Sequence, residues 1–340
     1  MRTRHMQPFS RRRFLEGLTL AGTTGLLGLY PRPVVAEPPP ETTRLRMQQI
    51  AGICIAPQYV AEDLLHLEGF TEVHYMQLGY GQSVYQALGS SALDIAMAFV
   101  PAFLIQIDAG TSLVLLGGVH VGCFELFGAA QVQTIRDLKG KTVAVPELGS
   151  VHQLFIASMA AYVGLDPQKD IHWAVHPPPA AMHLLAAGQI DALVAFPPVS
   201  QELRALRIGH VVVNSGLDRP WSQYFCCIVA GNREFVRKHP VATKRALRAI
   251  LKATDLCALE PDRAARLVVD KGFTQRYDYA QQTMQEIPYN RWREYNPEDT
   301  VRFYALRLHE AGMIKSSPQK LITQGTDWRF FNELKKELKE

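Results

Sequence analysis

Several common catalytic signatures are missing from this chain of 340 residues. It has no GxSxG nucleophile elbow, no HExxH metalloprotease motif and no Walker phosphate-binding loop. Its five cysteines contain no CxxC pair, which excludes a zinc ribbon and a thioredoxin-type motif. His172 and His176 are four positions apart but lie on an expected strand and its exit, so they do not share a helical face as metal ligands would. The sequence therefore predicts no catalytic residue, no metal and no cofactor, and we expect a protein that is not an enzyme.

An excess of charge of one sign is also missing once the amino terminus is set apart. Residues 1–36 hold six arginines and one glutamate of the chain's 36 basic and 32 acidic residues. The remainder thus carries 30 basic and 31 acidic residues. Nucleic-acid binding depends on a basic surface, so we expect no nucleic-acid partner.

The amino terminus is typical of an export signal. Arg11-Arg12 precedes an uncharged apolar stretch, residues 17–30, and then the small-residue cleavage site Val34-Val35-Ala36. We interpret residues 1–36 as a twin-arginine signal peptide that is cleaved after Ala36; the alternative is a basic disordered tail. The apolar stretch is short for a membrane span, and no other segment approaches the necessary length. We therefore expect a free, soluble protein in the periplasm.

An internal duplication is the most informative feature that is present. Residues 54–119 are similar to residues 146–216, about 97 positions later. Within them, residues 84–101 align without a gap with residues 181–198. This alignment pairs Asp94 with Asp191 and Phe99 with Phe196. Two long copies predict two lobes rather than a solenoid.

Each copy alternates short apolar runs with stretches of helical periodicity. The runs are 46–50, 73–76, 95–98 and 113–116 in the first copy, and 142–145, 171–175, 192–195 and 211–213 in the second. This β-α-β-α-β pattern predicts an α/β fold with a parallel sheet in each copy. The loops that follow the strands gather at one edge of each sheet, so two facing edges would form a ligand cleft. Farther along, Pro240, Pro261 and Pro297 are each expected to open a helix.

Residues 135–165, which include VAVPELGSVHQLFIASMAAYVGL, and the later segment Gly188-Gln189-Ile190-Asp191-Ala192 carry a family resemblance. The chain resembles the nitrate, sulfonate and taurine class of ABC-transporter substrate-binding proteins. The same superfamily includes proteins that bind pyrimidine precursors of thiamine. The resemblance implies a type II periplasmic-binding-protein fold, in which two α/β lobes are joined by two crossover strands. It would place the crossovers near 121–130 and 224–230, lobe 1 at 42–122 plus 231–340, and lobe 2 at 130–223.

The loop from Pro146 to His152 joins an expected strand to an expected helix. A helix start with glycine and serine, here Gly149-Ser150, offers unpaired N–H groups and the positive dipole end to an anion. The alternative is that Ser150 only caps its own helix. The equivalent turn in the first copy is 53–59.

Aromatic and charged residues near the expected cleft and crossovers complete the candidate site. Phe99 and Phe196 follow matching strands and would form cleft walls, although each could also be a core residue. Glu125 lies in an apolar crossover and is either a hinge hydrogen-bonder or a contact for a ligand amine. Arg219 and Trp221 could clamp an anion and cover it, or form a surface turn. The predicted ligand-binding residues are Cys54, Ile55, Ala56, Phe99, Val100, Glu125, Gly149, Ser150, Val151, His152, Phe196, Pro197, Arg219 and Trp221.

The five cysteines are interpreted as buried free thiols. Cys226 and Cys227 are adjacent on an expected strand and point to opposite faces, which disfavours a bond between them. One disulfide of unassigned pairing is the alternative.

The resemblance implies a monomeric periplasmic receptor that delivers a small, anionic solute to the permease and ATPase subunits of an ABC importer. The alternatives are a pyrimidine-precursor binder or pyrimidine-forming enzyme on the same scaffold, and a solute-sensing subunit.

Overall fold

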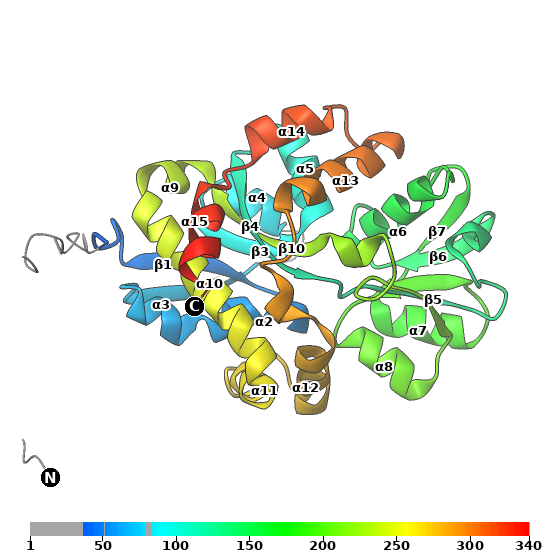
Figure 1. Ribbon diagram of the computed structural model, residues 1–340. Helices are drawn as coiled ribbons and strands as arrows, with labels where there is room; N and C mark the ends of the chain where they lie inside the picture. The colour runs from blue at the N-terminus through cyan, green and yellow to red at the C-terminus, as the bar shows by residue number, and fades with distance from the viewer. Residues whose placement is uncertain (1–36, 51, 79–82, 340) are drawn as a thin grey trace, which may run out of the picture. The chain divides into compact units, whose positions relative to one another are not determined.

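The computed structural model describes residues 37–50, 52–78 and 83–339 (Figure 1). The expected signal peptide, residues 1–36, lies outside the described residues. The chain from residue 39 onward forms one compact unit, whose parts are described below. Within the described residues, no helix has both the length and the apolar character that a membrane crossing requires.

The first sheet is built from two groups of strands that lie side by side. A parallel pair consists of β1 (Arg44–Gln49) and β2 (Glu72–Gln77). A mostly buried antiparallel group has the order β3-β10-β4, with β3 at Ile95–Phe99, β10 at Phe225–Asn232 and β4 at Leu113–Val121. Burial on both faces explains why these three strands read as continuous apolar runs in the sequence.

Two buried glutamines join β1 to β3. Gln48 donates a hydrogen bond from Nε2 to the carbonyl oxygen of Met97 at 2.7 Å, and Gln58 donates to the carbonyl oxygen of Gln48 at 2.8 Å. The amide of Met97 in turn donates to Oε1 of Gln58 at 3.3 Å. These side chains satisfy buried backbone groups where the two strands are not paired directly. The first lobe therefore has the strand order β2-β1-β3-β10-β4.

The second sheet has the order β7-β6-β8-β5-β9. Its strands are β5 (Glu125–Gly128), β6 (Lys141–Val145), β7 (Ile171–Val175), β8 (Ala192–Ala195) and β9 (His210–Asn214). β6 pairs in parallel with β7 and β8, whereas β5 is antiparallel to both of its neighbours. The order matches the first sheet strand for strand, because the antiparallel β5 stands where β10 stands in the first sheet.

A repeated aspartate contact shows the duplication at the level of atoms. Asp94 Oδ2 accepts a hydrogen bond from the amide of Arg46 at 2.8 Å, and Asp191 Oδ2 accepts one from the amide of Thr142 at 2.8 Å. In both copies the aspartate amide donates back to the carbonyl oxygen of the same residue. The two aspartates that the sequence alignment pairs thus fix the start of equivalent strands.

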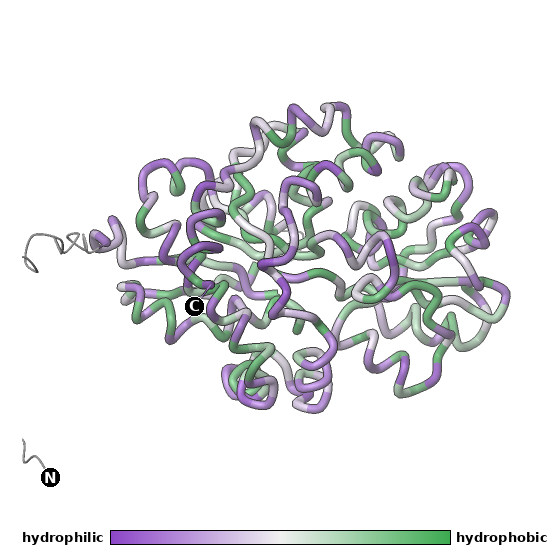
Figure 2. The backbone as a smooth tube through the Cα atoms, viewed as in Figure 1, coloured by the Kyte–Doolittle hydropathy of each residue, from purple (hydrophilic) through white to green (hydrophobic). Residues whose placement is uncertain are grey.

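Helices cover both sheets (Figure 1). Around the first sheet lie α2 (Ala56–Val60), α3 (Glu62–Leu67), α4 (Val84–Gly89), α5 (Val100–Asp108), α9 (Arg233–Lys238), α10 (Pro240–Leu259), α11 (Pro261–Asp270), α12 (Tyr277–Glu286), α14 (Pro318–Gly325) and α15 (Arg329–Glu337). Around the second lie α6 (Val151–Tyr162), α7 (Pro178–Ala186) and α8 (Val199–Leu206). Figure 2 shows hydrophobic residues along the strands and hydrophilic residues on the outer turns of helices such as α11 and α12.

Helix α13 (Pro297–Glu310) packs against both α5 and α6, and so contacts helices of both lobes. Proline occupies the first position of α10, α11 and α13, as the sequence predicted. Proline fits this position because the first N–H groups of a helix have no partner within it.

Candidate ligand-binding site

A cavity of about 530 Å³ lies between helices of the first lobe and the β6–α6 loop of the second. One wall comes from α4 and α5, and the other from the loop and first turns of α6. The lining residues are Ser83, Val84, Tyr85, Ala102, Ile105, Gln106, Pro146, Glu147, Leu148, Gly149, Ser150, Val151, His152 and Leu154. Four of the predicted site residues, Gly149 to His152, are among them.

Two helix starts line this cavity. Ser150 caps α6, because its hydroxyl accepts a hydrogen bond from the amide of Gln153 at 3.4 Å. Ser83 caps α4 in the same way, accepting from the amide of Tyr85 at 3.2 Å. The amide of Gly149, whose φ is +82°, donates to Gln153 Oε1 at 2.6 Å. Both serine hydroxyls therefore serve their own helices, and the remaining first-turn N–H groups are the donors that a ligand could use.

The cavity walls are almost free of full charge. Among the described lining residues there is no lysine or arginine, and Glu147 is the acidic one. Burial lowers the pKa of His152 to about 4, so its imidazole is neutral at neutral pH. Its ring lies 5.1 Å from that of Phe196. Such a cavity suits a ligand whose polar head is met by backbone N–H groups and whose apolar part contacts Val84 or Ile105.

A second cavity, of about 270 Å³, lies at the edge of the second sheet and shares Pro146 and His152 with the first. Phe196 lines it, together with apolar residues of β6, β8 and α7. The matching Phe99 lies elsewhere. It is buried, and its ring packs 4.8 Å from that of Phe124 and 5.8 Å from that of Tyr304.

The remaining candidates of the first lobe are core residues. Cys54 and Ile55 lie in a short 3₁₀ helix, η1 (Ile53–Ile55), and Ala56 follows at the start of α2. All three are buried, as is Val100 at the start of α5. The amide of Ile53 donates to the carbonyl oxygen of Pro197 at 3.2 Å. This segment therefore contacts the second lobe directly.

Glu125 and Pro197 line a third cavity, of about 250 Å³, where the chain passes between the lobes. Glu125 is buried on β5 and lies 3.5 Å from Nη1 of Arg204 on α8. Arg204 binds both carboxylate oxygens of Glu286 on α12, at 2.7 and 2.9 Å. An ion pair thus joins a helix of the second lobe to a helix of the first. Burial raises the pKa of Glu125 to about 7, against the opposing effect of Arg204.

This raised pKa predicts a pH-dependent contribution to stability. A carboxyl group that holds its proton more tightly when folded stabilises the protein at low pH, and this contribution is lost as pH rises from about 4.5 to about 7. Relative to Glu125→Gln, the wild-type protein should lose about 1 to 3 kcal/mol over this range, at about 1.4 kcal/mol per pKa unit. Urea unfolding of both proteins at several pH values measures the difference. Parallel pH profiles would contradict the assignment.

Arg219 and Trp221 have contrasting environments. Arg219 is exposed and precedes Pro220 through a cis peptide bond. Trp221 is 2% exposed, and its ring lies 5.6 Å from Phe155 and 5.5 Å from Phe303. The structure therefore places Trp221 between α6 and α13.

Tyr85 and Gln106 are cavity residues that the sequence reasoning missed, although the start of α4 falls inside the aligned repeat.

The fold is that of periplasmic binding proteins, with two α/β lobes, as the sequence predicted. The structure of the periplasmic nitrate-binding protein NrtA from Synechocystis PCC 6803 matches with a TM-score of 0.71 and 16% identity, over 89% of this chain and 90% of that one. The alkanesulfonate-binding protein SsuA from Xanthomonas axonopodis pv. citri, bound to MOPS, matches with a TM-score of 0.63 and 18% identity, over 81% and 96%.

The chain belongs to the NMT1-like family, whose model matches residues 38–269. A curated relative, the nitrate import ATP-binding protein NrtC from Synechocystis sp. (strain ATCC 27184 / PCC 6803 / Kazusa), is 29% identical over 140 residues. The match covers 38% of this chain and spans 21% of that protein's length.

Proposed function

We propose that this protein is the solute-binding component of an ABC importer and that it works by binding and lobe closure. The observation that carries this proposal is the cavity between α4 and α5 of one lobe and the start of α6 of the other. A solute there contacts both lobes at once, and therefore stabilises the closed arrangement over any open one. A permease and an ATPase would be its partners, and we expect it to act as a monomer.

For the solute, we propose a small organic anion such as a sulfonate. The first-turn N–H groups of α6 would meet the anionic head, and the apolar walls would meet a short carbon chain. The size of the cavity, about 530 Å³, exceeds what a bare inorganic anion fills. The names of the similar structures, nitrate-binding NrtA and alkanesulfonate-binding SsuA, agree with an anionic ligand class.

The lobe boundaries are part of this proposal. Lobe 1 would comprise residues 42–122 and 231–340, and lobe 2 residues 130–223. Two crossings between the sheets support two lobes, because the chain enters the second sheet through β5 and returns to the first through β10. The segments 121–130 and 224–230 would then contain the hinge, although β5 is itself a strand of the second sheet and β10 a strand of the first.

Filling the cavity should abolish or weaken solute binding. Val151→Trp places a large ring at the start of α6, inside the cavity, and we expect affinity to fall about tenfold or more, or about 1.4 kcal/mol. Calorimetric titration with a panel of alkanesulfonates, taurine and nitrate measures it. Val211→Trp, on the exposed face of β9, is the matched control. Equal affinity in wild type and both variants would place the solute elsewhere.

We also propose export through the twin-arginine route, with cleavage after Ala36. Changing Arg11 and Arg12 to lysine should retain the precursor in the cytoplasm, because the route recognises this arginine pair. Cell fractionation with immunoblotting measures the distribution. The control is Arg2 and Arg4 changed to lysine, which leaves the pair intact. Normal periplasmic accumulation of the Arg11/Arg12 variant would show that the arginine pair is incidental.

A further inference from the structure

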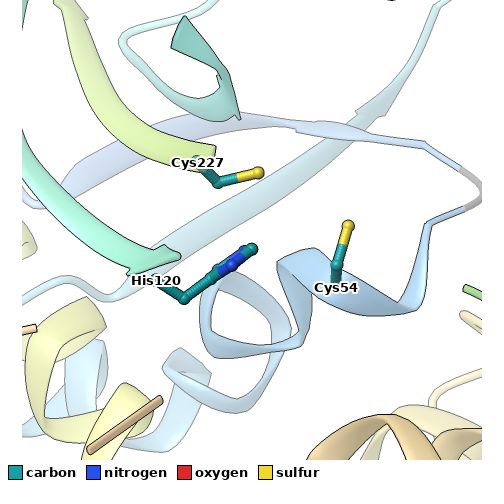
Figure 3. A group of neighbouring side chains, drawn as sticks. All are labelled: Cys54, His120 and Cys227. Carbon is teal, nitrogen blue, oxygen red and sulfur yellow. The ribbon is translucent and has the colours of Figure 1, made fainter. Parts of the chain in front are cut away.

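Four cysteines and one histidine converge where both interlobe connections meet the first helical segment of lobe 1. Cys54 lies in η1, His120 near the end of β4, Cys123 just before β5, and Cys226 and Cys227 at the start of β10. Figure 3 shows the side chains of Cys54, His120 and Cys227 directed toward one another from three separate elements. The potential ligand atoms of these three residues all lie within 4.8 Å of one another. The sulfur atoms of Cys123, Cys226 and Cys227 form a second such group, which shares Cys227 with the first.

The imidazole of His120 is oriented as a metal ligand would be. Its Nδ1 lies 2.9 Å from the carbonyl oxygen of Gly122, and since a carbonyl can only accept, Nδ1 carries the proton. Nε2 is buried and has no hydrogen-bond partner among the described residues. Histidines that bind metals usually donate the other ring N–H to a carbonyl or carboxylate in this way. The lone pair on Nε2 of His120 is therefore free to bind a metal ion inside the protein.

A second contact fixes the opposite side of the cluster. The hydroxyl of Tyr289 donates to the carbonyl oxygen of Cys54 at 2.9 Å, and the Tyr289 ring packs edge-on against His120 at 5.3 Å. Tyr289 is fully buried. It therefore restrains both the backbone of Cys54 and the ring of His120.

The three candidate ligands are enclosed by the protein: Cys54 is 6%, His120 0% and Cys227 4% exposed. A metal ion binds cysteine as the thiolate and histidine as the neutral imidazole, so binding at this cluster would release protons from the thiols.

We propose that Cys54, His120 and Cys227 bind a thiophilic d¹⁰ cation, Zn²⁺ or Cu⁺. Sulfur-rich sites that contain one imidazole select these ions over Mg²⁺ or Ca²⁺. With Zn²⁺, the thiols of Cys54 and Cys227 each release one proton, and two thiolates balance the two charges of the ion. The proposal goes beyond solute transport and does not depend on it.

Cys123 connects the buried cluster to a cavity through which an ion could enter. Unlike its three neighbours it is partly exposed, and it lines the cavity of about 250 Å³ between the lobes. Once bound, the ion would connect β4 and β10 to η1, and would therefore restrain the lobes at their junction.

Metal titration of the wild-type protein tests this site directly. The mature protein is purified without a histidine tag, reduced, freed of metal with a chelator, and titrated with Co²⁺ as a spectroscopic probe for Zn²⁺, and separately with Cu⁺ against a competing Cu⁺ chelator. We expect saturation at one equivalent with thiolate-to-metal charge-transfer absorption, and weaker binding as pH falls, because protons compete for the ligands. The two titrations show which ion is preferred. No saturable binding of either ion would overturn the proposal.

Serine variants identify the ligands. Cys54→Ser and Cys227→Ser should each lower the affinity by about 100-fold or more, since first-sphere ligands matter at least as much as the outer partners of a metal site. Cys257→Ser is the matched control, because Cys257 is fully buried in α10 and belongs to neither metal-binding group. Unchanged affinity in Cys54→Ser and Cys227→Ser would overturn the assignment. The sulfur atoms of Cys123 and Cys226 lie 3.1 Å apart, and isolation of the protein without metal and with these two cysteines joined in a disulfide would also overturn it. If a variant does not fold, the charge-transfer intensity of wild-type protein, which counts thiolate ligands, decides the matter. Because every arm is run without solute, failure here leaves the proposed transport function untouched.

Discussion

Replacing Trp221 with alanine is expected to lower the free energy of unfolding by about 3 to 5 kcal/mol. The side chain is 2% exposed and is enclosed by Phe155 and Tyr162 of α6 and by Phe303 of α13. Its removal leaves a cavity that these three rings cannot easily fill, so the loss includes both the transfer energy and the cavity. Because α13 also packs on α5, the variant weakens a contact between the lobes.

Denaturant unfolding, with the slope of the transition monitored, measures this loss. Trp173→Ala is the matched control, since Trp173 is only half-buried and donates from Nε1 to the carbonyl oxygen of Pro167 at 2.9 Å. Its loss should be clearly smaller. If Trp221→Ala were no more destabilising than Trp173→Ala, Trp221 would not be the packing centre that the structure shows.

Gly122→Ala is expected to cost more than about 2 kcal/mol, which exceeds the ordinary cost of a left-handed alanine. Gly122 has φ +64°, and a Cβ atom added there would lie 2.2 Å from the Cα of Gly216. The Cα of Gly216 belongs to the backbone, and the added Cβ is bonded to the backbone of residue 122. Neither atom can therefore move unless the backbone of its segment moves.

Gly140→Ala separates the cost of the left-handed backbone conformation from the cost of the close contact. Gly140 has φ +73°, but a Cβ atom there would meet nothing within 4 Å. It should therefore lose only the conformational part, about 1 to 2 kcal/mol. Thermal and urea unfolding of both variants gives the comparison. Equal losses would mean that the 122–216 contact relaxes at no cost.

The duplicated sequence predicted two α/β units, because the β-α-β connections within each copy are local. Asp94 and Asp191 show this, since each binds the first strand of its own copy. The sequence predicted a parallel sheet in each copy, whereas β10 and β5 are antiparallel to both of their neighbours. The insertion of β10 between β3 and β4 had no comparable signal. That pairing joins Ala98 to Ile228, and nothing in either segment alone specifies so distant a partner.

The candidate site was predictable where it follows from one loop. Gly149 to His152 line the cavity because a strand–loop–helix unit places them at the sheet edge. Phe99 and Trp221 depend on elements outside the repeat: Tyr304 and Phe303 of α13 pack against them. The periodicity of either copy contains no information on that helix.

The group formed by the four cysteines and His120 was also not predictable from the sequence. Spacing rules recognise ligands that lie close together in the chain, whereas Cys54, His120 and Cys227 come from three elements that meet only in the folded protein. Adjacent Cys226 and Cys227 suggested opposite faces of a strand, yet both sulfurs take part in one group with Cys123. A register irregularity of β10 beside Cys227 accompanies this arrangement.

The position of β10 has a consequence for synthesis. Every strand of the second sheet lies between residues 125 and 214, so that sheet is complete as soon as this segment has left the ribosome. The first sheet is begun earlier but lacks β10, the strand between β3 and β4, until residue 232 has emerged, and α13 is synthesised later still. The lobe that is translated second can therefore fold first, while β3 and β4 wait with exposed edges. We therefore expect the second lobe to complete its sheet before the first during synthesis.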